Sequence, residues 1–291
     1  MSFLGVLFAF GALFGWATGD FFIQRTTRAV GITKSLFYIG LVGAVALLPF
    51  VYSEVIPSLS DRSQWPLLIS VCVIVVLAAF SNFQGLKKGK LSVVLPLTGL
   101  ELPVTIALTT FLGHEILSPH IYLLMGATAI GIFLTTIVSL RDFRGLRFES
   151  GTLFALGGAI GLGVTNYLVG QASRAYSPLF TLWLTHTVAC LVAAALLYKT
   201  GILKPSLLLA DLKKHTLIIT LQSLLDNFAW LSYAYATTLI PIGIAATISE
   251  SFIVVGTLFG VIFNKEKLKT HQIIGITIAL AGVLALAAMA E

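Results

Sequence analysis

The sequence predicts an all-α integral membrane protein in which ten transmembrane helices form two inverted five-helix repeats. Three observations lead to this prediction. Charged residues make up 10% of the 291 residues and the mean hydropathy is +0.99, whereas about a quarter of the residues of a soluble domain are charged. Long apolar stretches follow one another along the whole chain, and the second half of the chain repeats the first.

Each apolar stretch approaches or exceeds the roughly 20 residues that a helix needs to cross a hydrocarbon layer of about 30 Å. The longest connections lie near residues 52–65 and 199–215, so no large domain outside the membrane is expected. The first stretch lacks a basic flank and a cleavage site, so we expect it to remain as a span. The predicted spans cover residues 3–24, 33–51, 66–86, 91–111, 120–140, 151–171, 178–198, 216–236, 241–263 and 271–290.

Basic residues gather in alternate connections, and this pattern predicts the orientation of the chain. All lysines and arginines except Arg62 and Arg174 follow the odd-numbered spans. Because positively charged loops stay in the cytoplasm, both termini should be extracytoplasmic. The net charge of +6 is spread over these loops, which explains it without nucleic acid as a partner. The compact loops and the lack of a presequence suggest a prokaryotic plasma (inner) membrane.

An internal duplication divides the chain into a first repeat, about residues 1–145, and a second repeat, about residues 150–291. Five spans in each repeat is an odd number, so the second repeat must enter the membrane from the opposite side. Inverted repeats of this kind recur in secondary transporters. The matching pairs include Leu7-Phe8-Ala9 with Leu153-Phe154-Ala155, Gly15 with Gly161, Arg28 with Arg174, Glu101 with Glu250, and Glu115 with Glu266.

Motifs in both repeats resemble the EamA-type repeat of the drug/metabolite transporter (DMT) superfamily. In the first repeat, Glu101-Leu102-Pro103-Val104-Thr105 is followed by Leu112-Gly113-His114-Glu115. In the second, Ile240-Pro241-Ile242-Gly243 precedes Ser249-Glu250 and Asn264-Lys265-Glu266. The order, spacing and duplication of these motifs make the match fairly specific, although each motif alone is loose. The resemblance implies a ten-helix transporter with a central cavity for metabolite-sized substrates.

Three carboxylates lie near the middle of predicted spans, and we expect Glu101, Glu250 and Asp226 to couple protons or bind substrate. An ionised aspartate at the membrane centre costs about 2.5–3.5 kcal/mol on insertion scales. No lysine or arginine lies mid-span to neutralise these groups, which leaves a proton, a cation or a cationic substrate group. The alternative is a permanently protonated structural carboxyl. Pro96 and Pro103 flank Glu101 and can kink its helix.

Polar and aromatic side chains at helical spacing predict the lining of a cavity. Gln222, Asp226, Trp230 and Tyr233 recur at spacings of four, four and three residues and therefore share one helix face, with Asn227 beside them. Each can also be read as ordinary packing, His186 as a satisfied interior histidine and Asp20 as an interfacial residue near the cytoplasmic helix end. The predicted lining residues are Gln222, Asn227, Trp230, Tyr233, Trp183, His186, Asn166, Tyr167, Asn82 and Asp20. Glu115 and Glu266, at helix ends, are expected to be structural.

We therefore predict a secondary active transporter that moves a small metabolite, such as an amino acid or drug, by alternating access with proton coupling. A uniporter or exchanger of the same fold, a non-transporting membrane scaffold or enzyme, and a channel are the alternatives. No motif indicates enzymatic chemistry, a cofactor or a metal site. Cys72 and Cys190 are expected to be buried, unpaired thiols. The expected partners are a small-molecule substrate and the lipid bilayer, with the protein a monomer or weak dimer.

Overall fold

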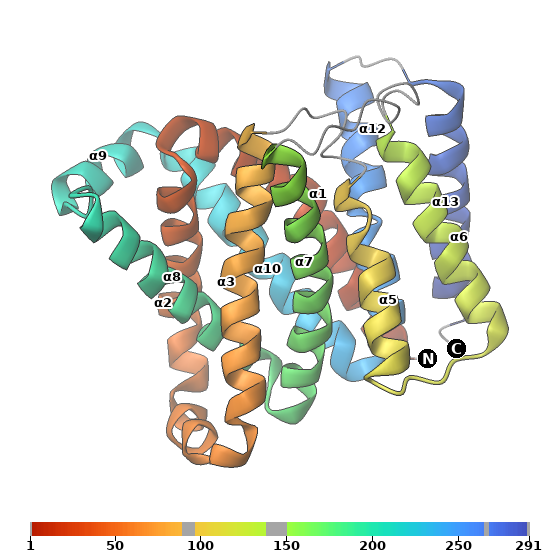
Figure 1. Ribbon diagram of the computed structural model, residues 1–291, viewed down its shortest axis with the longest axis horizontal. Coiled ribbons are helices and arrows are strands. Elements are labelled where there is room, and N and C mark those ends of the chain that lie inside the picture. Colours follow the sequence, from red (N-terminus) through yellow and green to blue (C-terminus); the bar gives the residue numbers. More distant parts are fainter. Residues whose placement is uncertain (1, 89–96, 138–149, 265–267, 290–291) are drawn as a thin grey trace.

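The computed structural model describes residues 2–88, 97–137, 150–264 and 268–289, and every regular element in these ranges is helical. The predicted all-α fold is therefore confirmed (Figure 1). The helices are α1 (Phe3–Val30), α2 (Ile32–Ser60), η1 (Arg62–Gln64), α3 (Trp65–Lys88), α5 (Glu101–Phe111), α6 (Pro119–Thr136), α7 (Ser150–Ala175), α8 (Pro178–Lys199), α9 (Pro205–Lys214), α10 (Thr216–Leu239), α11 (Ile242–Glu250), α12 (Phe252–Asn264) and α13 (Thr270–Ala288).

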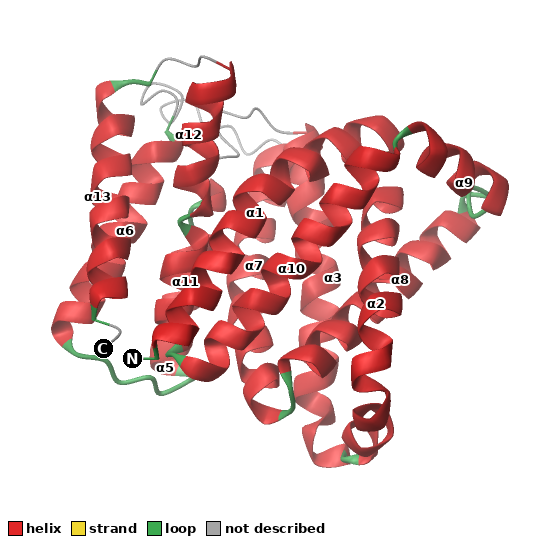
Figure 2. Ribbon diagram, turned by 180° about the vertical axis from the view of Figure 1, so that it is seen from behind, coloured by secondary structure: helices red, strands yellow, loops and turns green. Residues whose placement is uncertain are grey.

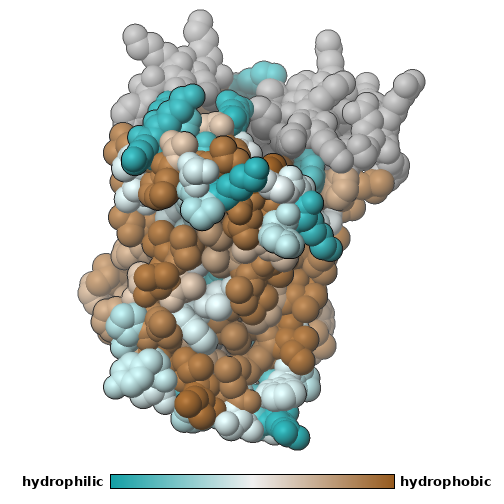
Figure 3. Space-filling view, turned by 90° about the vertical axis from the view of Figure 1, so that its left-hand side faces the viewer, coloured by the Kyte–Doolittle hydropathy of each residue, from teal (hydrophilic) through white to brown (hydrophobic). Residues whose placement is uncertain are grey.

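The protein is a multi-pass membrane protein, since eight stretches of the described chain are long and apolar enough to span a bilayer. Helix α10 has 24 residues but is not among the eight, because its polar side chains lower its hydropathy. Helix α5 is apolar but shorter, and residues 89–96 of the predicted fourth span lie outside the described ranges. The number of ten spans therefore stays a prediction. Figure 3 shows a broad hydrophobic band with hydrophilic side chains at its two ends.

Several predicted features fall wholly outside the described ranges. They are the boundary between the repeats at residues 145–149, Pro96, Lys90, Arg141, Arg144, Arg147, Lys265, Glu266 and Lys267.

Capping side chains and a glycine determine where several helices begin or end. Ser2 accepts a hydrogen bond from the Gly5 backbone N–H at 3.4 Å, and Ser177 accepts from the Phe180 N–H at 3.0 Å ahead of α8. These are N-caps that satisfy otherwise unpaired backbone donors. Between α1 and α2 a single residue, Gly31, has a φ of 90°, a conformation that glycine adopts without steric cost. Helix α1 runs to Val30, six residues past the predicted end at residue 24.

The two repeats pack reciprocally. The most extensive helix contacts join α1 to α10 and α3 to α7, while α2 packs on α8 and α6 on α13. The first two pairs are related by exchange of the repeats, as a two-fold arrangement requires. In Figure 1, α1 leads away from the face that carries both chain ends, whereas α7 runs towards it. The repeats are therefore inverted, as the odd number of predicted spans indicated. We call the face with both chain ends the terminal face.

Repeat-related glycines make these two contacts close. A Cβ added at Gly15 would lie 2.8 Å from the Ala229 Cβ, and one added at Gly161 would lie 2.9 Å from the Ala78 Cβ. Small residues allow helix backbones to approach one another in membranes. Gly15 and Gly161 therefore serve helix packing inside the bundle.

A matched pair of substitutions in α7 tests this packing. We expect Gly161→Ala to lower the free energy of unfolding by about 1–3 kcal/mol, because the new methyl overpacks the contact with α3. Gly157→Ala, where an added Cβ meets nothing within 4 Å, should be neutral or slightly stabilising because alanine favours helix. Thermal unfolding of both purified variants in detergent measures the difference. Equal stabilities would contradict the close α3–α7 contact.

Two predicted elements differ in the structure. The ninth span was expected to be one helix over 241–263 but consists of α11 and α12, which are interrupted at Ser251 (Figure 2). The connection 199–215, for which no helix was predicted, contains α9. The Lys34 side chain forms an ion pair with Asp211, and the Tyr38 hydroxyl donates to the Leu208 carbonyl at 2.9 Å. These contacts fasten α9 to α2.

Candidate functional site

Glu101 and Glu250, one from each repeat, meet at the centre of the bundle. The Asn166 side-chain amide donates to Glu101 Oε1 at 3.1 Å and to Glu250 Oε1 at 3.0 Å. All three residues are buried, with 8%, 2% and 0% of Glu101, Glu250 and Asn166 exposed. One nitrogen therefore holds two carboxyl groups close together in an interior without bulk water. We call Glu101 and Glu250 the carboxyl pair and Asn166 its bridge.

Both glutamates lie where a helix is broken. Glu101 is the first residue of α5 and follows a turn at residues 99–100, whereas Glu250 is the last residue of α11 and precedes the turn at Ser251. Broken helices near the membrane midplane often form transport sites, because the freed backbone groups and helix ends can meet a ligand or ion. The repeat-related carboxylates thus occupy the positions where the fold is interrupted.

The charge of the carboxyl pair has to be reduced by a ligand or a proton. Among the described residues no lysine or arginine forms an ion pair with Glu101 or Glu250. Two negative charges this close in a low-dielectric interior repel strongly. The arrangement is chemically suited to hold a proton between the two groups or to bind a cation.

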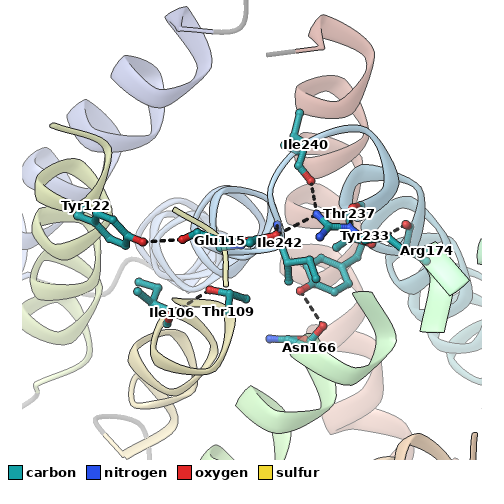
Figure 4. A network of polar contacts seen from close by, with 12 residues as sticks. Ile106, Thr109, Glu115, Tyr122, Asn166, Arg174, Tyr233, Thr237, Ile240 and Ile242 are labelled. Carbon is teal, nitrogen blue, oxygen red and sulfur yellow. Dashed lines mark hydrogen bonds and ion pairs between the residues drawn. The ribbon is translucent and has the colours of Figure 1, made fainter. Parts of the chain in front are cut away.

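Aromatic side chains lie beside the bridge. The Tyr233 hydroxyl donates to the Asn166 backbone carbonyl at 3.1 Å, as Figure 4 shows. The ring centroid of Trp16 lies 5.7 Å from Tyr233, 5.0 Å from Trp230 and 5.9 Å from Phe252. Trp230 and Tyr233 were predicted from the α10 stripe. Trp16 and Phe252 were missed because the apolar spans contain many aromatic residues and the spacing of these two does not single them out. We call these four side chains the aromatic cluster.

Asp20 belongs to the same region of the bundle. It was expected near the cytoplasmic end of its helix and within reach of Arg25, but α1 continues for ten residues beyond it. Arg25 instead stacks over the Phe21 ring at 4.0 Å. Asp20 lies within electrostatic range of Asp226, Glu101 and Glu250. A further acidic side chain of the first repeat therefore lies near the carboxyl pair.

His186 and Asp226 form a second polar pair. The His186 Nδ1 lies 3.0 Å from the Leu182 carbonyl oxygen, and its Nε2 lies 3.7 Å from Asp226 Oδ2. A carbonyl oxygen only accepts, so Nδ1 carries a hydrogen and Nε2 is left for the carboxyl. The side chains are 9% and 13% exposed. The ring and the carboxyl group therefore form a mostly buried polar contact between α8 and α10.

Gln222 and Asn227 of α10 hold this helix against α2 by hydrogen bonds. Ser35 donates to the Gln222 side-chain oxygen at 2.8 Å, and the Asn227 amide donates to the Ile39 carbonyl at 3.1 Å. Gln222 is fully buried. Both contacts join α10 to α2, and Asn227 Oδ1 is buried without a hydrogen-bond partner. Gln222 and Asn227 thus serve helix packing in this structure, although Gln222 belongs to the predicted stripe and Asn227 lies beside it.

Three further predicted lining residues contact other parts of the bundle. The Trp183 ring packs against Phe180, with centroids 6.1 Å apart. Tyr167 lies beside Gly113 in the connection after α5, and Asn82 lies beside Gly158 in the close contact between α3 and α7. The structure therefore gathers Glu101, Glu250, Asn166, Tyr233, Trp230, Asp20, Asp226 and His186 around the bundle centre and distributes the others. Cys72 and Cys190 are buried and unpaired, as expected.

The model of the EamA-like transporter family matches residues 3–137 and 149–288. No protein with a curated function matches at a significant level. A solved structure titled "Crystal structure of protein" aligns with a TM-score of 0.76 and 16% identity, covering 100% of this chain and 97% of the other. At this identity the likeness concerns the fold.

Proposed function

Because the chain belongs to the EamA-like transporter family, and through it to the drug/metabolite transporter superfamily, we propose that it is a secondary active transporter driven by protons. It moves a small metabolite by alternating access and carries out no chemistry on it. The carboxyl pair and its bridge are the single observation that supports proton coupling most directly. Glu101 comes from the first repeat and Glu250 and Asn166 from the second, so a shift of one repeat against the other changes the distance between the carboxyl groups.

The surroundings of the pair favour a substrate that is neutral or carries an amine. Asp20 and Asp226 add acidic groups, and a polyanion would be repelled. The aromatic cluster offers ring faces next to these carboxylates, and a cation over an aromatic face is attracted by about 0.5–2 kcal/mol. Amino acids and organic amines match this combination of aromatic and acidic groups.

The proposal also gives the orientation of the chain in the membrane and its oligomeric state. Lys213 and Lys214 on α9 lie at the end of the bundle opposite to both chain ends. With basic loops in the cytoplasm, the terminal face is extracytoplasmic in a prokaryotic plasma membrane. The protein acts as a monomer or weak dimer.

The experiment begins with purified protein and a library of amino acids and organic amines. Thermal shifts at two pH values identify the compound that stabilises the protein. That compound is then offered to proteoliposomes with and without a pH gradient. Accumulation against its concentration gradient only when the pH gradient is present supports proton coupling. Equilibration alone supports the uniporter or exchanger, which would hold an amine on the same carboxylates.

A further inference from the structure

Glu115, which the sequence suggested to be structural, joins the connection after α5 to the start of α11. Its carboxylate accepts from the Ile242 backbone N–H at 2.8 Å and from the Gly243 N–H at 3.1 Å. The Tyr122 hydroxyl donates to the Glu115 carbonyl at 2.7 Å and fixes the backbone that presents it. A negative side chain at a helix N-terminus is favourable because it faces unpaired N–H groups and the positive end of the helix dipole.

Arg174 completes the same contact from the end of α7. Its Nη2 lies 3.0 Å from Glu115 Oε1. The guanidinium also donates to the Thr237 carbonyl at 2.7 Å and to the Ile240 carbonyl at 3.1 Å, at the end of α10 (Figure 4). One side chain from the first repeat and one from the second thus hold the α10–α11 corner in place.

This contact lies at the terminal face, on the floor of an open pocket. The pocket has a volume of about 410 Å³ and is lined by Glu115, Ile116, Leu117, Arg174, Thr238, Leu239, Ile240 and Pro241. The Arg174 side chain is 34% exposed and the Glu115 side chain 9%. Solvent therefore reaches the outer side of the ion pair, while the inner side faces the buried helix α11.

Helix α11 connects the ion pair with the carboxyl pair. Its nine residues are all buried, and it extends from the N–H groups bound by Glu115 to Glu250 at its last position. A helix of this length spans roughly 13 Å. Met125 and Thr109 pack against its first turn at Gly243. Any displacement of the α11 start therefore moves the segment that carries Glu250.

From these contacts we propose that Glu115 and Arg174 form a latch that closes the terminal face and positions Glu250 through α11. The latch holds while Glu250 is paired with Glu101 through Asn166, and neutralisation of Glu250 loosens it. This coupling rests on the proposed transport function, whereas closure by the latch does not. Glu115 and Arg174 are positioning residues, because they act on the carboxyl pair through α11.

Labelling of a buried cysteine tests the latch without any substrate. Thr109 is 1% exposed and its hydroxyl oxygen would lie 3.1 Å from a Cβ at Gly243, so it lies directly inside the latch. Thr109→Cys is introduced after Cys72→Ala and Cys190→Ala, and a membrane-impermeant maleimide is added from the terminal face. We expect slow labelling that Glu115→Gln or Arg174→Gln accelerates by roughly tenfold or more, within the usual range of coupling between sites.

The controls separate the parts of this proposal. The double variant Glu115→Gln with Arg174→Gln should label no faster than the faster single variant, because both changes open one contact. Asp61→Asn, an exposed carboxylate in the connection after α2, should leave the rate unchanged. Unchanged labelling in correctly folded Glu115→Gln and Arg174→Gln proteins would overturn the latch. Unchanged labelling in Glu250→Gln alone would overturn its coupling to the carboxyl pair, even if proton-driven transport were observed.

Discussion

Replacing Glu101 or Glu250 with glutamine is expected to abolish accumulation driven by a pH gradient. A gradient of two pH units supplies about 2.7 kcal/mol per proton, enough for roughly 100-fold accumulation of a substrate that moves with one proton. Glutamine keeps a side-chain oxygen that can accept from Asn166 but cannot gain or lose a proton. Each variant should therefore reach only equal concentrations on both sides, a loss of about 100-fold in accumulation.

Exchange of labelled for unlabelled substrate at equal pH distinguishes lost coupling from lost folding. Because exchange needs no net proton movement, it should continue in both variants. Asp61→Asn, remote from the carboxyl pair and its bridge, should accumulate substrate like the unmodified protein. Full gradient-driven accumulation in both glutamine variants would show that the protons travel elsewhere, and the pair would then be a structural contact.

The helices of this fold could be predicted because each depends on its own sequence. Apolar stretches of span length, serine caps and the glycine between α1 and α2 are local signals. The break at Ser251 was missed since neither Ser251 nor Phe252 disrupts an apolar pattern as proline or glycine would. Helix α9 was missed because its position depends on Lys34 and Tyr38 of α2, far away in the chain.

The candidate site was predictable in its residue types but not in its pairing. A carboxylate in an apolar span is visible in one helix, so Glu101, Glu250 and Asp226 could be named from the sequence. That Asn166 bridges the first two follows only from the meeting of α5, α7 and α11. The sequence showed Arg174 only as the repeat partner of Arg28 and as an exception to the basic-loop pattern. Its contacts with Glu115 and the α10 carbonyls, which the fold alone creates, reveal its role.

Replacing His186 with leucine is expected to destabilise the protein by about 3 kcal/mol at neutral pH, the lower end of the range for removing one member of a buried charge pair. Asp226 would lose its basic neighbour at 3.7 Å while staying mostly buried, with 13% of its side chain exposed. Thermal unfolding of the purified proteins in detergent measures this loss.

The double variant His186→Leu with Asp226→Leu provides the decisive comparison. Removal of both polar groups leaves neither of them buried without its partner, so the double variant should be more stable than His186→Leu alone. If instead the two changes add, His186 contributes only its packing and its bond to the Leu182 carbonyl, and its contact with Asp226 contributes no stability.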